Sequence, residues 1–264
     1  MNIKKRLSHR IVRRKRDYAI NLILPVKDTT FLVEETIYFT MMLKADLHSH
    51  TRFSYDSATT VDQLIHRCQK VGITCLAVTD HHSIEGALRV AEKAPFKVII
   101  GEEIFSQGGE LIGLFLKERI PPGLPFDETI HRIKDQGGLV YLPHPVSGIR
   151  HSKLSLETVT KYAHLIDIVE RYNSRTLFQK ESDFDWVTEL TNRHNWVVAA
   201  ASDAHSVFEF GNVLITMQPF ETPQQFLSSL SEATISFKKS PLWIRIFLNH
   251  KVRKWMRRNL PNDR

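Results

Sequence analysis

Short apolar runs alternate with segments of helical periodicity along residues 44–237. Val61, Leu64 and Cys68 fall at helical spacing behind two threonines that are candidate caps, and Gly72 stops this helix. The run 73–79 then predicts a buried strand. The same alternation predicts helices near 83–94, 127–136, 155–165 and 182–194, and strands near 97–103, 110–116, 138–143, 167–172 and 196–202. This pattern is typical of a mostly parallel α/β sheet or a barrel, and about seven strands without a dinucleotide-binding glycine fingerprint favour the barrel.

Composition and charge divide the chain into three parts. Its 264 residues are 42% hydrophobic, which is enough for a substantial core. Residues 1–43 hold nine Lys/Arg against four Asp/Glu, and residues 238–264 hold nine against one, so residues 44–237 carry −6 of the total charge of +7. We therefore expect a single domain at 44–237 between a basic N-terminal extension and a basic C-terminal segment. An acidic, histidine-rich middle fits cation binding better than a nucleic-acid groove.

The two ends allow only limited expectations. Met41 and Met42 lie just before the domain, so one hypothesis is that translation begins there and that residues 1–40 are not made. The pattern of apolar and basic residues over 241–258 predicts an amphipathic helix with a basic face. We favour docking of its apolar face on the barrel, with the basic face available to polyanions, over contact with membrane or nucleic acid. Two cysteines are too few for a disulfide framework, and no apolar run is long enough to span a bilayer, which favours a cytoplasmic protein.

Potential metal ligands follow most of the expected strands. Asp46, His48 and His50 alternate, and alternate side chains of an extended strand share a face. Taken alone, this run fits a polar edge strand as well as a metal site. A short loop after the same strand adds Asp56, and other strand ends add Asp80, His81, Glu102, Glu103, His144, Glu170, Asp203 and His205. Because parallel strands of a barrel end at the same rim, the set predicts a site for more than one metal ion.

The same segments resemble the PHP (polymerase and histidinol phosphatase) family of metal-dependent phosphoesterases. The resemblance rests on Asp46-Leu47-His48-Ser49-His50 with Asp56, Thr79-Asp80-His81, Gly101-Glu102-Glu103-Ile104, Leu142-Pro143-His144-Pro145 and Ser202-Asp203-Ala204-His205. It covers about residues 44–237. It implies a distorted (β/α)7 barrel that holds two or three divalent ions, commonly manganese, iron or zinc.

Roles for individual residues follow from this resemblance. It implies one metal held by His48, His50, Glu103 and Asp203, a second held by Asp56, His81 and His205, and a third held by Glu103 and His144. Glu110 stands where trinuclear relatives carry a further histidine, so either Glu110 replaces it or the site holds two metals. Of the adjacent pair His81 and His82, we favour His81 as a ligand. Asp46, Asp80 and Glu170 are expected to support ligands instead of binding metal.

The implied reaction is in-line attack on phosphorus by a metal-bridging hydroxide. Its substrate would be a phosphorylated small molecule, a nucleotide or a short oligonucleotide. Asp203 or a neighbouring histidine such as His205 is expected to assist proton transfer. Arg175, in a family-like Asn-x-Arg segment, is the leading phosphate-binding candidate, ahead of Arg150 and His151.

Two other functions compete with this one. The first is a non-catalytic, metal-stabilised module that is recruited to polyanions through its basic ends. The second is hydrolysis of C–N bonds on a similar barrel, which we disfavour because no lysine lies at the expected strand ends.

Overall fold

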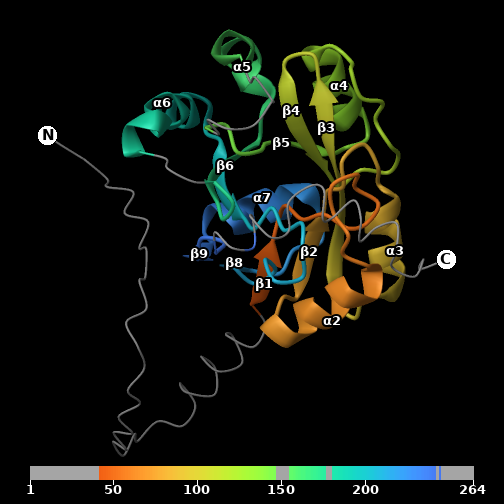
Figure 1. Cartoon of the computed structure of the whole chain (residues 1–264). Coiled ribbons are helices and arrows are strands. Elements are labelled where there is room, and N and C mark those ends of the chain that lie inside the picture. Colours follow the sequence, from red (N-terminus) through yellow and green to blue (C-terminus); the bar gives the residue numbers. More distant parts are fainter. Residues whose placement is uncertain (1–41, 147–154, 177–179, 242–243, 245–264) are drawn as a thin grey trace, which may run out of the picture.

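The computed structural model describes residues 42–146, 155–176, 180–241 and 244 (Figure 1). In this part of the chain one sheet contains β1 (Leu43–Asp46), β2 (Cys75–Val78), β3 (Lys97–Ser106), β4 (Gly109–Leu114), β5 (Leu139–Leu142), β6 (Ile168–Asn173), β7 (Val197–Ala201), β8 (Val213–Met217) and β9 (Thr234–Phe237). The helices are α2 (Val61–Val71), α3 (Glu85–Lys93), α4 (Phe126–Asp135), α5 (Leu156–Tyr162), α6 (Asp185–His194) and α7 (Pro223–Ser231), with 3-10 turns η1 (Ala163–Leu165) and η2 (Glu181–Phe184).

The sheet has the order β7-β6-β5-β4-β3-β2-β1-β8-β9. It curls until β7 contacts β8, so the sheet is a nearly closed barrel, as predicted. The expectation of a mostly parallel sheet is only half right: β4 runs antiparallel to β3 and β5, and β8 runs antiparallel to β1 and β9. The tight turn between Ser106 and Gly109 makes a hairpin of β3 and β4, whereas a parallel pair needs a longer crossover.

Local sequence signals mark the start of α2 and α7 and the end of α2. The Thr60 side chain accepts a hydrogen bond from the Gln63 amide, the Gln63 side chain accepts one from Thr60, and Gly72 ends α2 with φ 76°. Thr222 and Gln225 form the same capping box at α7. Neither α7 nor β8 and β9 were among the predicted elements.

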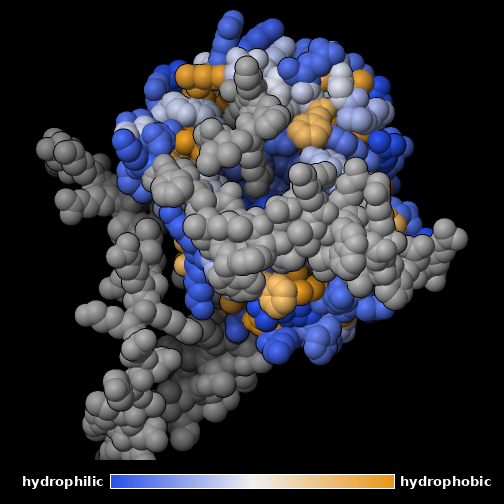
Figure 2. Space-filling model, in the orientation of Figure 1, coloured by the Kyte–Doolittle hydropathy of each residue, from blue (hydrophilic) through white to orange (hydrophobic). Residues whose placement is uncertain are grey.

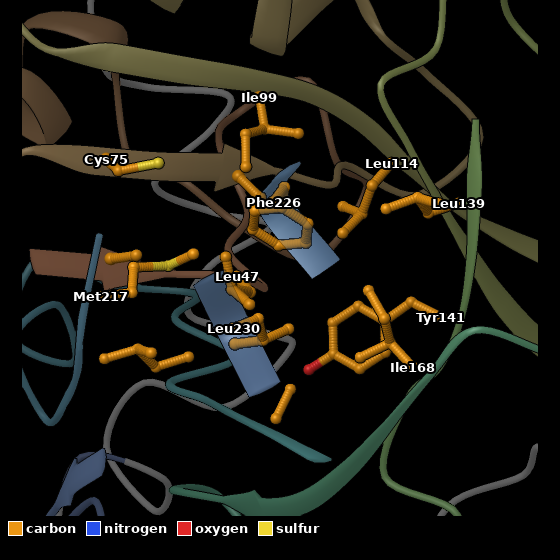
Figure 3. Packing of buried hydrophobic residues seen from close by; sticks show 14 of the residues in the cluster. Leu47, Cys75, Ile99, Leu114, Leu139, Tyr141, Ile168, Met217, Phe226 and Leu230 are labelled. Atoms are coloured by element: carbon orange, nitrogen blue, oxygen red, sulfur yellow. The ribbon is translucent and has the colours of Figure 1, made fainter. Parts of the chain in front are cut away.

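Three apolar clusters pack against the sheet, one inside its curve and two outside it. The inner cluster contains Phe226 and Leu230 of α7, which pack against Leu47, Tyr141 and Ile168 inside the curved sheet (Figure 3). A second cluster lies beneath α4, α5 and α6, and a third beneath α2 and α3. The interior of the barrel is therefore filled by α7 and apolar strand residues. Leu47, which directly precedes His48, belongs to this inner cluster and places the first polar motif at its border.

The described surface is mostly hydrophilic in the view of Figure 2. Its exposed large hydrophobic side chains are Tyr55, Leu88, Leu156 and Phe208. None of the helices in the described residues is long and apolar enough to cross a membrane. Most of both basic extensions, including nearly all of the helix predicted at 241–258, and the loop with Arg150 and His151 lie outside the described residues, so those expectations stay predictions.

Candidate metal centre

The segment after β1 places His48 and His50 side by side. Residues 47–50 continue β1 between two other strand ends. After β7, the Asp203 amide donates to the His48 carbonyl and the Ala204 carbonyl accepts from the His50 amide, and after β2 the Thr79 amide donates to the Ser49 carbonyl, each at 2.9 Å. Both imidazoles are fully buried, and their Nε2 atoms lie 3.0 Å apart. The alternation in sequence therefore brings two ligand atoms to one point, as predicted.

Glu103 lies at the centre of the cluster. Its Oε2 is 3.2 Å from His48 Nε2, 3.3 Å from His50 Nε2 and 3.4 Å from His81 Nδ1. Its Oε1 is 3.0 Å from His144 Nε2. One carboxylate thus faces four imidazoles from three strand ends, which is the geometry that a bridging ligand requires.

A second group of donor atoms comes from His50, Asp56, His81 and His205, all within 4.8 Å of one another. Asp56 Oδ2 is 2.8 Å from His205 Nε2 and 3.7 Å from His81 Nε2. Ser54 holds the loop in place, since its hydroxyl donates to Asp56 Oδ1 at 2.9 Å.

His144 and Asp203 occupy backbone conformations that few non-glycine residues adopt. Their φ angles are 27° and 52°, in or near the left-handed region. His48, His144 and Asp203 form a further group of donor atoms within 4.8 Å. Strained backbone at two strand ends that both supply donors is typical of functional sites.

Glu110 on β4 forms one more group of donor atoms with His81 and Glu103. The residue is 8% exposed, and its Oε2 has no hydrogen-bond partner among the described residues. The same oxygen lies 3.7 Å from His144 Nε2. Glu110 therefore stands where a substitute for the missing histidine would have to stand.

Carboxylates behind the cluster orient its ligands. Glu170 Oε2 lies 3.0 Å from His48 Nδ1 and accepts a hydrogen bond from Tyr141 at 2.8 Å. Glu170 Oε1 and Asp203 Oδ2 both accept from the Asn173 side chain, at 2.5 and 3.1 Å. A carboxylate on the far nitrogen fixes the tautomer and orientation of a ligating histidine.

Asp46 and Asp80 are fully buried and act through the backbone. Asp46 Oδ1 accepts from the Ser202 amide at 3.0 Å, next to Asp203. Asp80 accepts from both the amide and the hydroxyl of Thr51 at 2.6 Å, next to His50. Burial raises the pKa of Asp46 to about 6, although the hydrogen bonds from Ser202 oppose this rise.

Two residues beside predicted ligands turn away from the donor groups. Glu102 accepts from the Ile120 amide at 2.8 Å, because successive side chains of β3 point to opposite faces. Burial raises its pKa to about 7, while the Ile120 hydrogen bond and Arg119 oppose the rise. His82, with φ 57°, belongs to none of the donor groups found among the described residues.

Arg175 lies at the edge of the cluster. Its Nη1 is 2.5 Å from His205 Nδ1 and 3.7 Å from Asp203 Oδ1. On its other side, Nε lies 3.2 Å from Oε1 of Glu209, which sequence reasoning missed. A glutamate in a turn has no distinguishing pattern, so no local signal pointed to Glu209.

Mutual charges shift the pKa values of the cluster strongly. Burial by itself would raise the pKa of Glu103, but the charges of His48 and His81 hold it well below its usual value. Burial would likewise lower the pKa of His50, yet hydrogen bonds with Asp203 and Glu103 raise it to about 9. Burial and the adjacent Arg175 hold the pKa of His205 well below its usual value. Against the effect of burial, the neighbouring carboxylates thus raise the pKa of both His48 and His50 and favour their protonated forms, and a divalent cation that displaced these protons would take over the balance of charge.

The donor set fits divalent transition metals. Imidazole nitrogens combined with carboxylate oxygens suit zinc, iron and manganese. Four overlapping donor groups and the buried, unsatisfied oxygen of Glu110 leave room for more than one ion. The structure thus brings together every residue predicted to bind metal.

Comparisons with known proteins agree with this arrangement. The model of the PHP domain family matches residues 46–236. The uncharacterized protein MJ0417 of Methanocaldococcus jannaschii is 32% identical over 211 residues, which are 75% of this chain and 83% of MJ0417. MJ1587 of the same organism is 42% identical over 120 residues, 40% of this chain and 70% of that protein. A shorter match, 36% identical over 64 residues, covers 23% of this chain and 6% of an error-prone DNA polymerase of Mycobacterium tuberculosis.

Solved structures share the fold. A two-domain protein from Bacteroides vulgatus, described as containing a predicted PHP-like metal-dependent phosphoesterase, aligns with TM-score 0.60 and 17% identity over 75% of this chain and 65% of that chain. PsfC from Pseudomonas syringae aligns with TM-score 0.56 and 14% identity over 81% and 98%. From the family match over most of its length and the similarity to MJ0417, we conclude that the chain belongs to the PHP domain family.

Proposed function

We propose that residues 44–237 form a metal-dependent phosphoesterase that hydrolyses a phosphomonoester or a phosphoester of a nucleotide or short oligonucleotide. The observation that supports this best is the convergence at one rim of His48, His50, Asp56, His81, Glu103, His144, Asp203 and His205. Family membership and the description of the B. vulgatus protein point to the same chemistry. The short match to a DNA polymerase favours a nucleotide-type substrate over other phosphoesters.

Two or three manganese, iron or zinc ions would lower the pKa of a water molecule toward neutrality and neutralise phosphate oxygens. Glu103 links the donor groups and so keeps their ligand atoms close together. Arg175 has a guanidinium at the edge of the cluster, where it can bind phosphate oxygens through two donors. Asp203 and His205 lie on the same side and are the groups best placed to accept or donate a proton.

The test is a screen of the manganese-loaded protein against nucleotides, bisphosphorylated nucleotides, sugar phosphates and short end-labelled RNA. Release of inorganic phosphate identifies a phosphatase, and stepwise release of nucleotides identifies an exonuclease. His50→Ala and Asp203→Ala should each lower turnover by roughly 100-fold or more, since each removes a ligand. His66→Ala, an exposed histidine on α2, is the matched control and should leave turnover unchanged. Activity that survives both ligand substitutions would overturn the proposed site.

The alternative from sequence, a metal-stabilised binding module, has less support. A purely structural ion needs one closed set of ligands, whereas this rim has four overlapping groups and an unsatisfied carboxylate oxygen. Metal binding without hydrolysis of any phosphoester in the screen would favour the binding module.

A further inference from the structure

Glu209 is a buried carboxylate that none of the sequence motifs includes. It lies four residues after His205 and is 1% exposed. A carboxylate at this depth is costly unless its oxygens find donors or cations. Its Oε2 accepts from the His205 amide and from the Ser206 hydroxyl, each at 3.0 Å. Its Oε1 instead forms an ion pair with Arg175 Nε, 3.2 Å away, although neither atom makes a hydrogen bond among the described residues.

The guanidinium of Arg175 therefore has polar partners on two sides. Glu209 faces Nε, while Nη1 reaches His205 Nδ1 at 2.5 Å and Asp203 Oδ1 at 3.7 Å. The side chain is 10% exposed, so the planar fork has little room to rotate. With the charge of Glu209 beside Nε, Nη1 lies on the side of the rim that carries His205 and Asp203.

The tautomer of His205 determines which donors of Arg175 are available. His205 Nδ1 also lies 2.8 Å from the Asp203 carbonyl oxygen. A histidine that binds metal through Nε2 keeps its proton on Nδ1 and donates it to such an oxygen. In that state Nδ1 no longer accepts from Arg175, so Nη1 is available to another acceptor while Nε stays beside Glu209.

We propose that Glu209 is the positioning residue for Arg175: it holds Nε of the guanidinium so that the Nη groups can bind a phosphoryl group at the metal centre. This role rests on the proposed phosphoesterase function. Glu209 does not touch the substrate and acts through Arg175 alone. Its loss should therefore weaken phosphate binding only when Arg175 is present.

Glu209→Gln separates this role from a structural one. Glutamine keeps the volume and can still accept from the His205 amide and the Ser206 hydroxyl, but it loses the charge that faces Arg175. Calorimetric titration of the manganese-loaded full chain with inorganic phosphate should show affinity weakened about tenfold. Bound manganese should stay unchanged. Glu189→Gln is the matched control, because Glu189 is an exposed glutamate that pairs with Arg193 on α6.

A double-mutant cycle completes the test. In an Arg175→Ala background, Glu209→Gln should cause no further loss of phosphate affinity. Unchanged affinity in Glu209→Gln, an equal loss in both backgrounds, or loss of manganese would each overturn the positioning role. Hydrolysis of phenyl phosphate by the wild-type chain checks the proposed function separately. A wild-type chain that neither hydrolyses this ester nor binds phosphate would overturn both proposals.

Discussion

Replacing Glu110 by glutamine should raise the stability of the metal-free protein. The Glu110 carboxylate is 8% exposed, and its Oε2 lacks a hydrogen-bond partner among the described residues. A buried polar group without a partner costs about 1–3 kcal/mol, and removing its charge relieves much of that cost. In a domain of this size each kcal/mol shifts Tm by about 2–4 °C. The metal-free variant should therefore melt roughly 2–6 °C above the wild type.

With metal present the sign should reverse. The same oxygen belongs to a donor group with His81 and Glu103 and lies 3.7 Å from His144 Nε2. Loss of a ligand that weakens metal binding about tenfold to a hundredfold removes about 1.4–2.7 kcal/mol of metal-linked stabilisation at saturating metal. The variant should then melt below the wild type.

Thermal melts in EDTA and in excess manganese, with metal content measured by mass spectrometry, test both expectations. Glu118→Gln changes an exposed glutamate in the same way and should not shift Tm in either condition. A change of the same sign in both conditions, with unaltered metal content, would refute the reasoning that Glu110 faces a metal.

Three further outcomes are expected. A Cβ at Gly86 would lie 2.0 Å from Asp80 Oδ2 and 2.4 Å from Thr51 Oγ1. Gly86→Ala should therefore lower the free energy of unfolding in urea by about 2 kcal/mol or more and weaken manganese binding. An unchanged free energy of unfolding would contradict the close contact. Burial raises the pKa of Glu102 from 4.5 to about 7, so the stability that its protonated form contributes is complete below pH 4.5 and is lost as pH rises to about 7. The free energy of unfolding of Glu102→Gln, measured in EDTA, should therefore rise relative to the wild type by up to about 3 kcal/mol between pH 5 and 8. A difference between the two proteins that does not change with pH would contradict this expectation. Because the metal-free pKa of His50 is about 9, manganese binding at pH 7.5 should release at least about one proton, seen as a dependence of the calorimetric heat on the ionisation enthalpy of the buffer; equal heats in all buffers would contradict it.

The alternation of apolar runs predicted the barrel because hydrophobic periodicity is a local signal, and some elements add capping residues to it. Thr60, Gln63 and Gly72 set the bounds of α2 without help from the rest of the fold. Strand direction has no such signal, since β4 reads as an apolar run whichever way it pairs. For this reason the antiparallel half of the pairings became visible only in three dimensions.

Most of the predicted metal ligands share one property: they follow strands whose ends meet at one rim, whereas Glu103 lies within β3 and Glu110 near the start of β4. Strand alternation also separated Glu103 from Glu102, once β3 was in place. Supporting residues have no such rule. Tyr141 reaches the cluster from within an apolar strand, and Glu209 reaches it from a turn after β7, so their roles depend on packing that sequence spacing does not encode.

Charge balance connects the predictions made for different residues of the rim. The rim has more negative than positive side chains, since the guanidinium of Arg175 faces several buried or half-buried carboxylates: Asp56, Glu103, Glu110, Glu170, Asp203 and Glu209. In the described residues the remaining compensation comes from imidazoles, and protons on His48 and His50 are favoured by the neighbouring carboxylates. Ions that bind here would replace these protons, and Glu110, an unsatisfied buried carboxylate without metal, would then act as a ligand under the proposed function. Glu209 differs from the rest, because its charge is opposed by Arg175 and not by a histidine. Substitution of Glu209 should therefore affect phosphate binding without changing metal content, whereas substitution of Glu110 should change metal content first.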